Sequence, residues 1–112
     1  MDELAALRRA IDALDDQLYA LLVQRLDRAR ALGALKPVGG RDPGREAAIV
    51  ARLSAHGPLD PELVALIWAA FFAASDKVQQ ADRLDAMLHA ERAQATSAEG
   101  PGAPSTPRRR ED

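Results

Sequence analysis

Residues 2–35 read DELAALRRAIDALDDQLYALLVQRLDRARALGAL, a stretch without proline and with one glycine, Gly33. Its apolar residues recur at alternating intervals of three and four, at Leu4, Leu7, Ile11, Leu14, Leu18 and Leu21. This spacing predicts an α-helix with one apolar seam. A helix of about 34 residues extends roughly 50 Å, which exceeds the expected diameter of a domain of this size. We therefore expect the helix to project beyond its own chain and to need a partner that covers the seam.

Two further helices are predicted after the segment 37–40, PVGG, which ends the first one. Asp-Pro pairs at 42–43 and 60–61 each supply an N-cap and a first-turn proline. They predict a short helix that ends at about Ala55 and a medium helix that ends at about Leu88. No run alternates polar and apolar residues at period two for long enough to predict a strand. The predicted fold class is all-α, with a long, a short and a medium helix.

Composition excludes several classes of protein. The 112 residues fit one domain, expected at 1–90, and the Ala-, Pro-, Ser- and Arg-rich segment 91–112 is predicted to be a disordered tail. Zero cysteines and two histidines argue against a disulfide framework, a zinc site and a histidine-centred triad. A net charge of −2 predicts no nucleic-acid binding, and Arg108 to Arg110 are offset by two neighbouring acids.

The apolar run from Leu63 to Ala74 is too short to cross a bilayer, and no signal peptide precedes the first helix. We therefore expect a soluble, cytoplasmic protein without a membrane partner.

Cations interrupt the seam after Leu21, because the next two seam positions are Arg25 and Arg28. One interpretation is that the seam has passed the dimer contact and both arginines are solvated. The other is an anion site, since Lys36 lies eleven residues after Arg25 and thus close to the same helix face. Arg28 lies off that face and is the weaker candidate.

Arg8 is too far from this group to reach it within one chain, since it lies roughly 42 Å along the helix from Lys36. If it binds the same ligand, it must do so in the site of an antiparallel partner, which requires a dimer with shared sites.

Polar residues on the other two helices complete the set of candidates. Asp42 is expected to cap its helix, whereas the adjacent Arg45-Glu46 is either a surface ion pair or part of an anion site at the helix start. On the third helix, one stripe runs from aromatic to polar and ends at Ser75 and Gln79, which are candidates for a pocket. The stripe comprises Trp68, Phe72, Ser75 and Gln79, whereas Asp76, Lys77 and Asp82 are expected on a solvated face.

The order and spacing of one series of residues are the most specific feature of the chain. The series is Leu7-Arg8, Ile11-Asp12, Leu14-Asp15, Leu21-Leu22, Arg25, Gly33, Lys36, Asp42, Arg45-Glu46, Ser75 and Gln79. It resembles the all-helical AroQ class of chorismate mutases over about residues 3 to 85. The resemblance implies an intertwined homodimer with two shared active sites, and the rearrangement of chorismate to prephenate without a metal or other cofactor.

The resemblance also implies roles for individual residues. Arg25 and the partner's Arg8 would bind the two substrate carboxylates, and Lys36 and Gln79 would donate to the ether oxygen. Glu46 would accept from the ring hydroxyl. Asp42, Arg45 and Ser75 would support the binding of the substrate carboxylate and the ring hydroxyl.

Some alternatives stay open. Gln80 competes with Gln79 for the ether oxygen, and the segment between Lys36 and Asp42 is a few residues shorter than is typical of the family, which leaves the placement of Asp42 open. Relatives of the same fold act as isochorismate-pyruvate lyases or aminodeoxychorismate mutases, and a helical dimerisation module would have no catalytic role.

Overall fold

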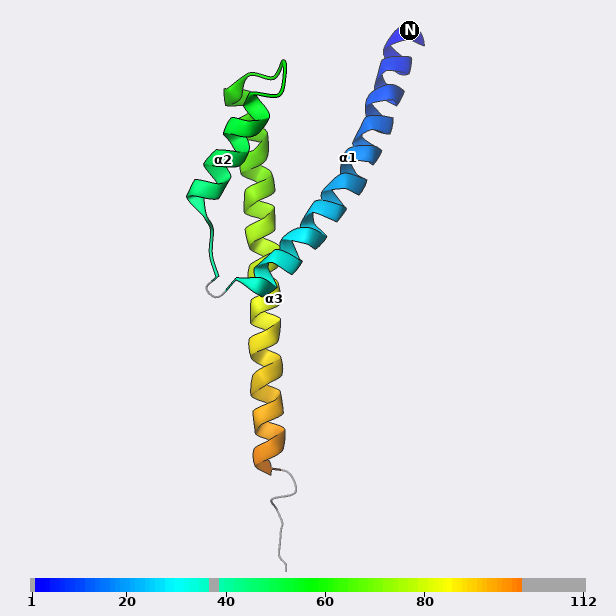
Figure 1. Cartoon of the computed structure of the whole chain (residues 1–112). Coiled ribbons are helices and arrows are strands. Elements are labelled where there is room, and N and C mark those ends of the chain that lie inside the picture. The colour runs from blue at the N-terminus through cyan, green and yellow to red at the C-terminus, as the bar shows by residue number, and fades with distance from the viewer. Residues whose placement is uncertain (1, 37–38, 100–112) are drawn as a thin grey trace, which may run out of the picture. The chain divides into compact units, whose positions relative to one another are not determined.

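The computed structural model describes residues 2–36 and 39–99, which form three helices and no strand. They are α1 (Asp2–Leu35), α2 (Pro43–Ser54) and α3 (Pro61–Glu99), shown in chain order from blue to orange in Figure 1. The all-α class and the ends of the first helix are confirmed. The chain divides into two units, residues 1–79 and 80–112, which are described separately.

The Asp-Pro pairs start α2 and α3 as predicted. The Asp42 carboxylate accepts a hydrogen bond of 3.0 Å from the backbone N–H of Arg45, and Pro43 occupies the first turn. The Asp60 carboxylate accepts one of 3.0 Å from the N–H of Glu62. Each carboxylate satisfies one of the free N–H groups at its helix start.

The predicted end of the third helix is wrong, because α3 continues eleven residues past Leu88 and is the longest helix rather than a medium one. Leu88 is followed by HAERAQATSAE, which includes four alanines together with Glu, Arg and Gln. No glycine or proline lies between Leu88 and Gly100. Alanine is the strongest helix former, so this composition sustains a helix without a buried face. The remainder of the predicted tail, 100–112, lies outside the described residues, and the boundary at residue 90 stays a prediction.

The core of the 1–79 unit is small. Within it α2 lies alongside the first part of α3 (Figure 1), and the buried apolar side chains are Val64 and Phe72. No residue of α1 is buried. The predicted seam is more than half exposed along its whole length, at Leu4, Leu7, Ile11, Leu14, Leu18 and Leu21. A single chain therefore leaves the apolar face of α1 uncovered.

Candidate functional site

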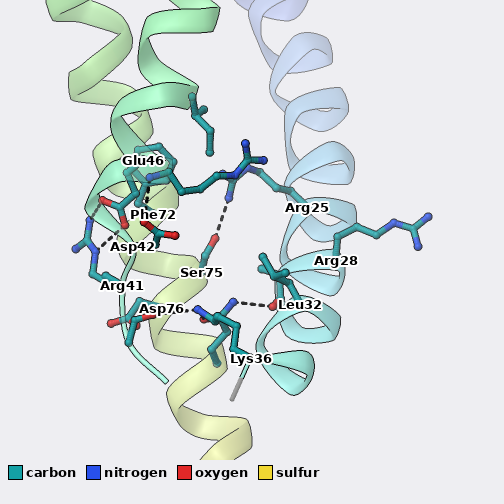
Figure 2. A pocket seen from close by; sticks show the side chains of 15 residues that line it. Arg25, Arg28, Leu32, Lys36, Arg41, Asp42, Glu46, Phe72, Ser75 and Asp76 are labelled. Atoms are coloured by element: carbon teal, nitrogen blue, oxygen red, sulfur yellow. Dashed lines mark hydrogen bonds and ion pairs between the residues drawn. The ribbon is translucent and has the colours of Figure 1, made fainter. Parts of the chain in front are cut away.

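One pocket of about 290 Å³ collects polar side chains from all three helices of the 1–79 unit. This volume lies near the lower end of the range for small-molecule sites, roughly 300–1,000 Å³. Figure 2 shows the pocket, with α1 supplying one wall and α2 and α3 the other. Its lining comprises Arg25, Arg28, Ala29, Leu32, Lys36, Gly40, Arg41, Asp42, Arg45, Glu46, Ile49, Phe72, Ser75, Asp76 and Gln79.

Arg25 is held in the pocket by neutral groups of α3. Its Nη1 donates to Ser75 Oγ at 2.8 Å, and Ser75 Oγ in turn donates to the carbonyl of Phe71 at 2.9 Å. The guanidinium carbon lies 5.7 Å from the centre of the Phe72 ring. Burial, and then the charge of Arg45, lower the pKa of Arg25. Two cations that share one small pocket favour an anionic ligand there.

Lys36 and Gln79 form a second polar centre. Lys36 Nζ donates to Gln79 Oε1 and to the carbonyl of Gly40, both at 3.0 Å. Gln79 Nε2 donates to the carbonyl of Ala29 at 2.7 Å, and its side chain is buried. A lysine ammonium only donates and a carbonyl only accepts, so the two partners together fix the orientation of the Gln79 amide. An ammonium has three N–H donors and a primary amide two. Among the contacts of the described residues, each group therefore keeps one donor for a ligand.

The tight turn at Gly40 and the small size of Gly33 shape this centre. Gly40 has a φ of +108°, a conformation that side chains other than glycine rarely adopt, and it turns the short loop so that its carbonyl meets Lys36. Gly33 faces Gln79 so closely that an added Cβ would lie 2.7 Å from Gln79 Cγ. The glycine therefore gives the buried amide its space.

Glu46 is paired with Arg41, not with the neighbouring Arg45. Arg41 Nε and Nη2 donate to the two carboxylate oxygens of Glu46 at 2.9 and 2.8 Å. This hydrogen bonding lowers the pKa of Glu46 and raises that of Arg41. The prediction of an Arg45-Glu46 surface ion pair is wrong, because the Asp42 cap starts a helix in which consecutive side chains point in different directions.

The structure brings most of the predicted site residues together. Seven of them line the pocket, namely Arg25, Lys36, Asp42, Arg45, Glu46, Ser75 and Gln79. Arg8 is exposed on α1 and does not line it, so its role in a partner's site stays a prediction. Gln80 is exposed and also lies outside the lining, whereas Gln79 is buried within it. The structure therefore favours Gln79 over Gln80.

Arg41 and Asp76 were missed by sequence reasoning. The placement of Asp76 on a solvated face is wrong, because this residue is half-buried and lines the pocket. Its position three residues before Gln79, one turn of helix away, was a usable signal. Arg41 carried a weaker signal, as the cation that directly precedes the helix cap. Arg28, the weaker sequence candidate, is exposed but contributes to the lining.

Comparison with protein families identifies the chain. The family model described as chorismate mutase type II matches residues 7–80. The chain belongs to the chorismate mutase type II family. The matched range contains every residue of the pocket lining, and family membership supports chorismate mutase activity in general. The comparisons with curated proteins and with solved structures gave no match.

Within residues 2–36 and 39–99, no three His, Asp or Glu side chains are grouped so that they could hold a metal ion. None of the helices in these ranges has the length and apolar character needed to cross a membrane.

Proposed function

We propose that this protein is a chorismate mutase that converts chorismate to prephenate, a step toward phenylalanine and tyrosine, and that residues 1–90 carry the activity. The observation that carries the proposal is the convergence of Arg25, Lys36 and Gln79 on one small pocket. A scaffold has no need to align two cations and a buried amide beside one another.

The reaction explains why donors, rather than a base or a nucleophile, are needed. One C–O bond of the ether breaks while one C–C bond forms within the same molecule, and no proton or group is transferred. Negative charge grows on the ether oxygen in the transition state. The remaining donors of Lys36 and Gln79 are suited to that oxygen, and fixed donors stabilise such charge more than mobile water does.

Substrate binding would use the cations on the other side of the pocket. Chorismate carries two carboxylates, and Arg25, with the charge of Arg45 beside it, is suited to one of them. Ser75 supports this role by anchoring the Arg25 guanidinium. Glu46 would accept a hydrogen bond from the ring hydroxyl. Asp42 would act mainly through the helix cap that positions Arg45.

The second carboxylate would be bound by the partner's Arg8 in an intertwined homodimer. The support is the exposed seam of α1, where Leu7, Ile11 and Leu14 are 61, 56 and 55% exposed. Burying a side chain of this size contributes about 1.5–3 kcal/mol. Six seam residues covered by a second copy would therefore add far more stability than the small core of one chain provides.

The decisive test is turnover of chorismate by the purified protein without added metal or cofactor, with the product identified. Formation of prephenate is the expected result. Turnover of isochorismate to salicylate and pyruvate, or of aminodeoxychorismate alone, would replace the proposal with one of the two related activities. No turnover of any of the three would favour a non-catalytic dimerisation module.

Shared sites predict complementation between two inactive variants. An equal mixture of Arg8→Ala and Lys36→Ala chains, allowed to exchange subunits, should recover about a quarter of the wild-type rate, because half of the dimers are mixed and each has one intact site. Each variant alone is the control. Confirmed exchange without recovered activity would show that Arg8 and Lys36 do not serve sites shared across the dimer.

A further inference from the structure

Arg41, in the loop before α2, interacts with one acidic residue of α2 and with one of α3. It donates to both oxygens of the Glu46 carboxylate, and Figure 2 shows these two bonds at the edge of the pocket. The charge of Asp76 on α3 also acts on Arg41 and raises its pKa, after the larger effect of Glu46. The guanidinium thus connects the loop before α2 with two acidic groups in the pocket lining.

Two parallel N–H···O bonds restrict Glu46 more than a single contact would. A bidentate arginine–carboxylate pair fixes both the position and the plane of the carboxylate. Each oxygen retains a lone pair for a ligand, since a carboxylate oxygen accepts more than one hydrogen bond. Glu46 can therefore accept from a ring substituent while Arg41 holds it.

We propose that Arg41 is a positioning and specificity-determining residue, which aims Glu46 at the ring substituent of the substrate and selects a neutral hydroxyl over an ammonium at that point. The proposal rests on the proposed chorismate mutase activity. The physical basis of this selectivity is the net charge of the Arg41–Glu46 pair. Glu46 alone would attract an ammonium more than a hydroxyl. With Arg41 bound to both oxygens, the charge of the Glu46 carboxylate is compensated and an ammonium meets a neighbouring cation. The charges of Asp42, which acts on Glu46, and of Asp76, which acts on Arg41, are unchanged by a substitution at Arg41.

The first test measures the pKa of the Glu46 carboxyl by NMR in the ligand-free protein. Arg41 hydrogen bonding lowers this pKa below the ordinary value of 4.5, so Arg41→Met should raise it toward that value. Arg30→Met is the matched control, because Arg30 is an exposed arginine that pairs with Asp27 at 3.5 Å and does not line the pocket. An unchanged Glu46 pKa in Arg41→Met would overturn the positioning role.

The lowering of the Glu46 pKa by Arg41 also predicts how activity depends on pH. A carboxylate with a lowered pKa stays ionised to lower pH, so Glu46 remains an acceptor in the wild-type protein over the range in which an ordinary glutamate is protonated. The acid limb of kcat/KM should therefore move to higher pH in Arg41→Met. A purely structural role of Arg41 would lower the whole profile without moving this limb.

The second test compares kcat/KM for chorismate with kcat/KM for aminodeoxychorismate, which has an amine in place of the ring hydroxyl. The ratio should fall about tenfold in Arg41→Met, because the repelling cation is lost. Arg41→Lys keeps the charge and should keep the ratio, with a higher KM because the two-point contact is lost. A ratio that is the same in wild type and Arg41→Met would overturn the specificity role.

These two tests separate the inference from the proposed function. If the wild-type protein converts neither substrate, the proposed activity is rejected and the specificity role fails with it. The NMR titration still decides whether Arg41 controls Glu46, because it requires no turnover.

Discussion

Replacing Lys36 by alanine is expected to lower kcat for chorismate by about 1,000-fold, in line with the loss of a donor aimed at developing negative charge. The effect should fall on kcat more than on KM, because the ether oxygen gains its charge only in the transition state. Lys36 Nζ also donates to Gln79 Oε1 at 3.0 Å. The loss of Lys36 therefore removes one of the two contacts that fix the Gln79 amide, the second donor to the ether oxygen. The measurement is steady-state kinetics with purified protein.

The control for this variant is Lys77→Ala, which removes an exposed lysine on α3 that does not line the pocket. Both variants should retain the helical circular dichroism of the wild type, since Lys36 lies just beyond the end of α1. Near-wild-type kcat in a folded Lys36→Ala protein would remove the ammonium from the mechanism.

The second large effect is expected from Gly33→Ala, which adds a single methyl group. An added Cβ would lie 2.7 Å from Gln79 Cγ, a distance that real Cβ atoms essentially never show, and 3.0 Å from Cδ, which is tighter than most real Cβ contacts. The contacts run along the whole Gln79 side chain, from Cβ at 3.3 Å to the amide carbon Cδ, and this side chain is buried, so Gln79 has to move. A displacement of about 1 Å at a catalytic group can lower the rate about 100-fold, and a fall in kcat of about 10- to 100-fold is expected.

Helix propensity favours the Gly33→Ala substitution, whereas the contact with Gln79 opposes it. Alanine is a better helix former than glycine, by about 1 kcal/mol in a helix interior and less in the last turn of α1, where Gly33 lies. A loss of activity in Gly33→Ala would therefore not reflect a weaker helix. Gly57→Ala is the control, since no atom beyond its two chain neighbours lies within 4 Å of its added Cβ.

A double-mutant cycle tests whether the methyl group acts through Gln79. In a Gln79→Ala background the Gly33→Ala substitution should have little further effect, because the side chain that it displaces is gone. Two independent losses that multiply would contradict this explanation.

The secondary structure could be predicted largely from local signals. The seam of residues 2–35 and the Asp-Pro pairs are properties of short windows, and a helix forms or stops within such windows. The end of α3 was missed because the residues after Leu88 lack an apolar pattern, although their helix propensity is high. In that segment propensity, and not amphipathic packing, extends the helix.

The candidate site was predictable in its membership but not in its contacts. Arg25, Lys36, Ser75 and Gln79 followed from breaks in the apolar pattern and from the family resemblance. The pairing of Glu46 with Arg41 rather than Arg45 did not, because adjacent positions on a helix give no information about which side chain meets which. Asp76 was misplaced for a similar reason, since a polar residue beside a pocket resembles a solvated one in sequence.

The sequence by itself determined the three helix starts, the apolar seam of α1 and the polar residues that interrupt the pattern. Only the tertiary structure decided that Arg25 meets Ser75, 50 positions away, and that Lys36 meets Gln79, 43 positions away. The physical reason is that helical periodicity arises from hydrogen bonds between near neighbours. Contacts across the pocket depend instead on how α1 and α3 approach each other, and on the space that Gly33 leaves for a buried amide.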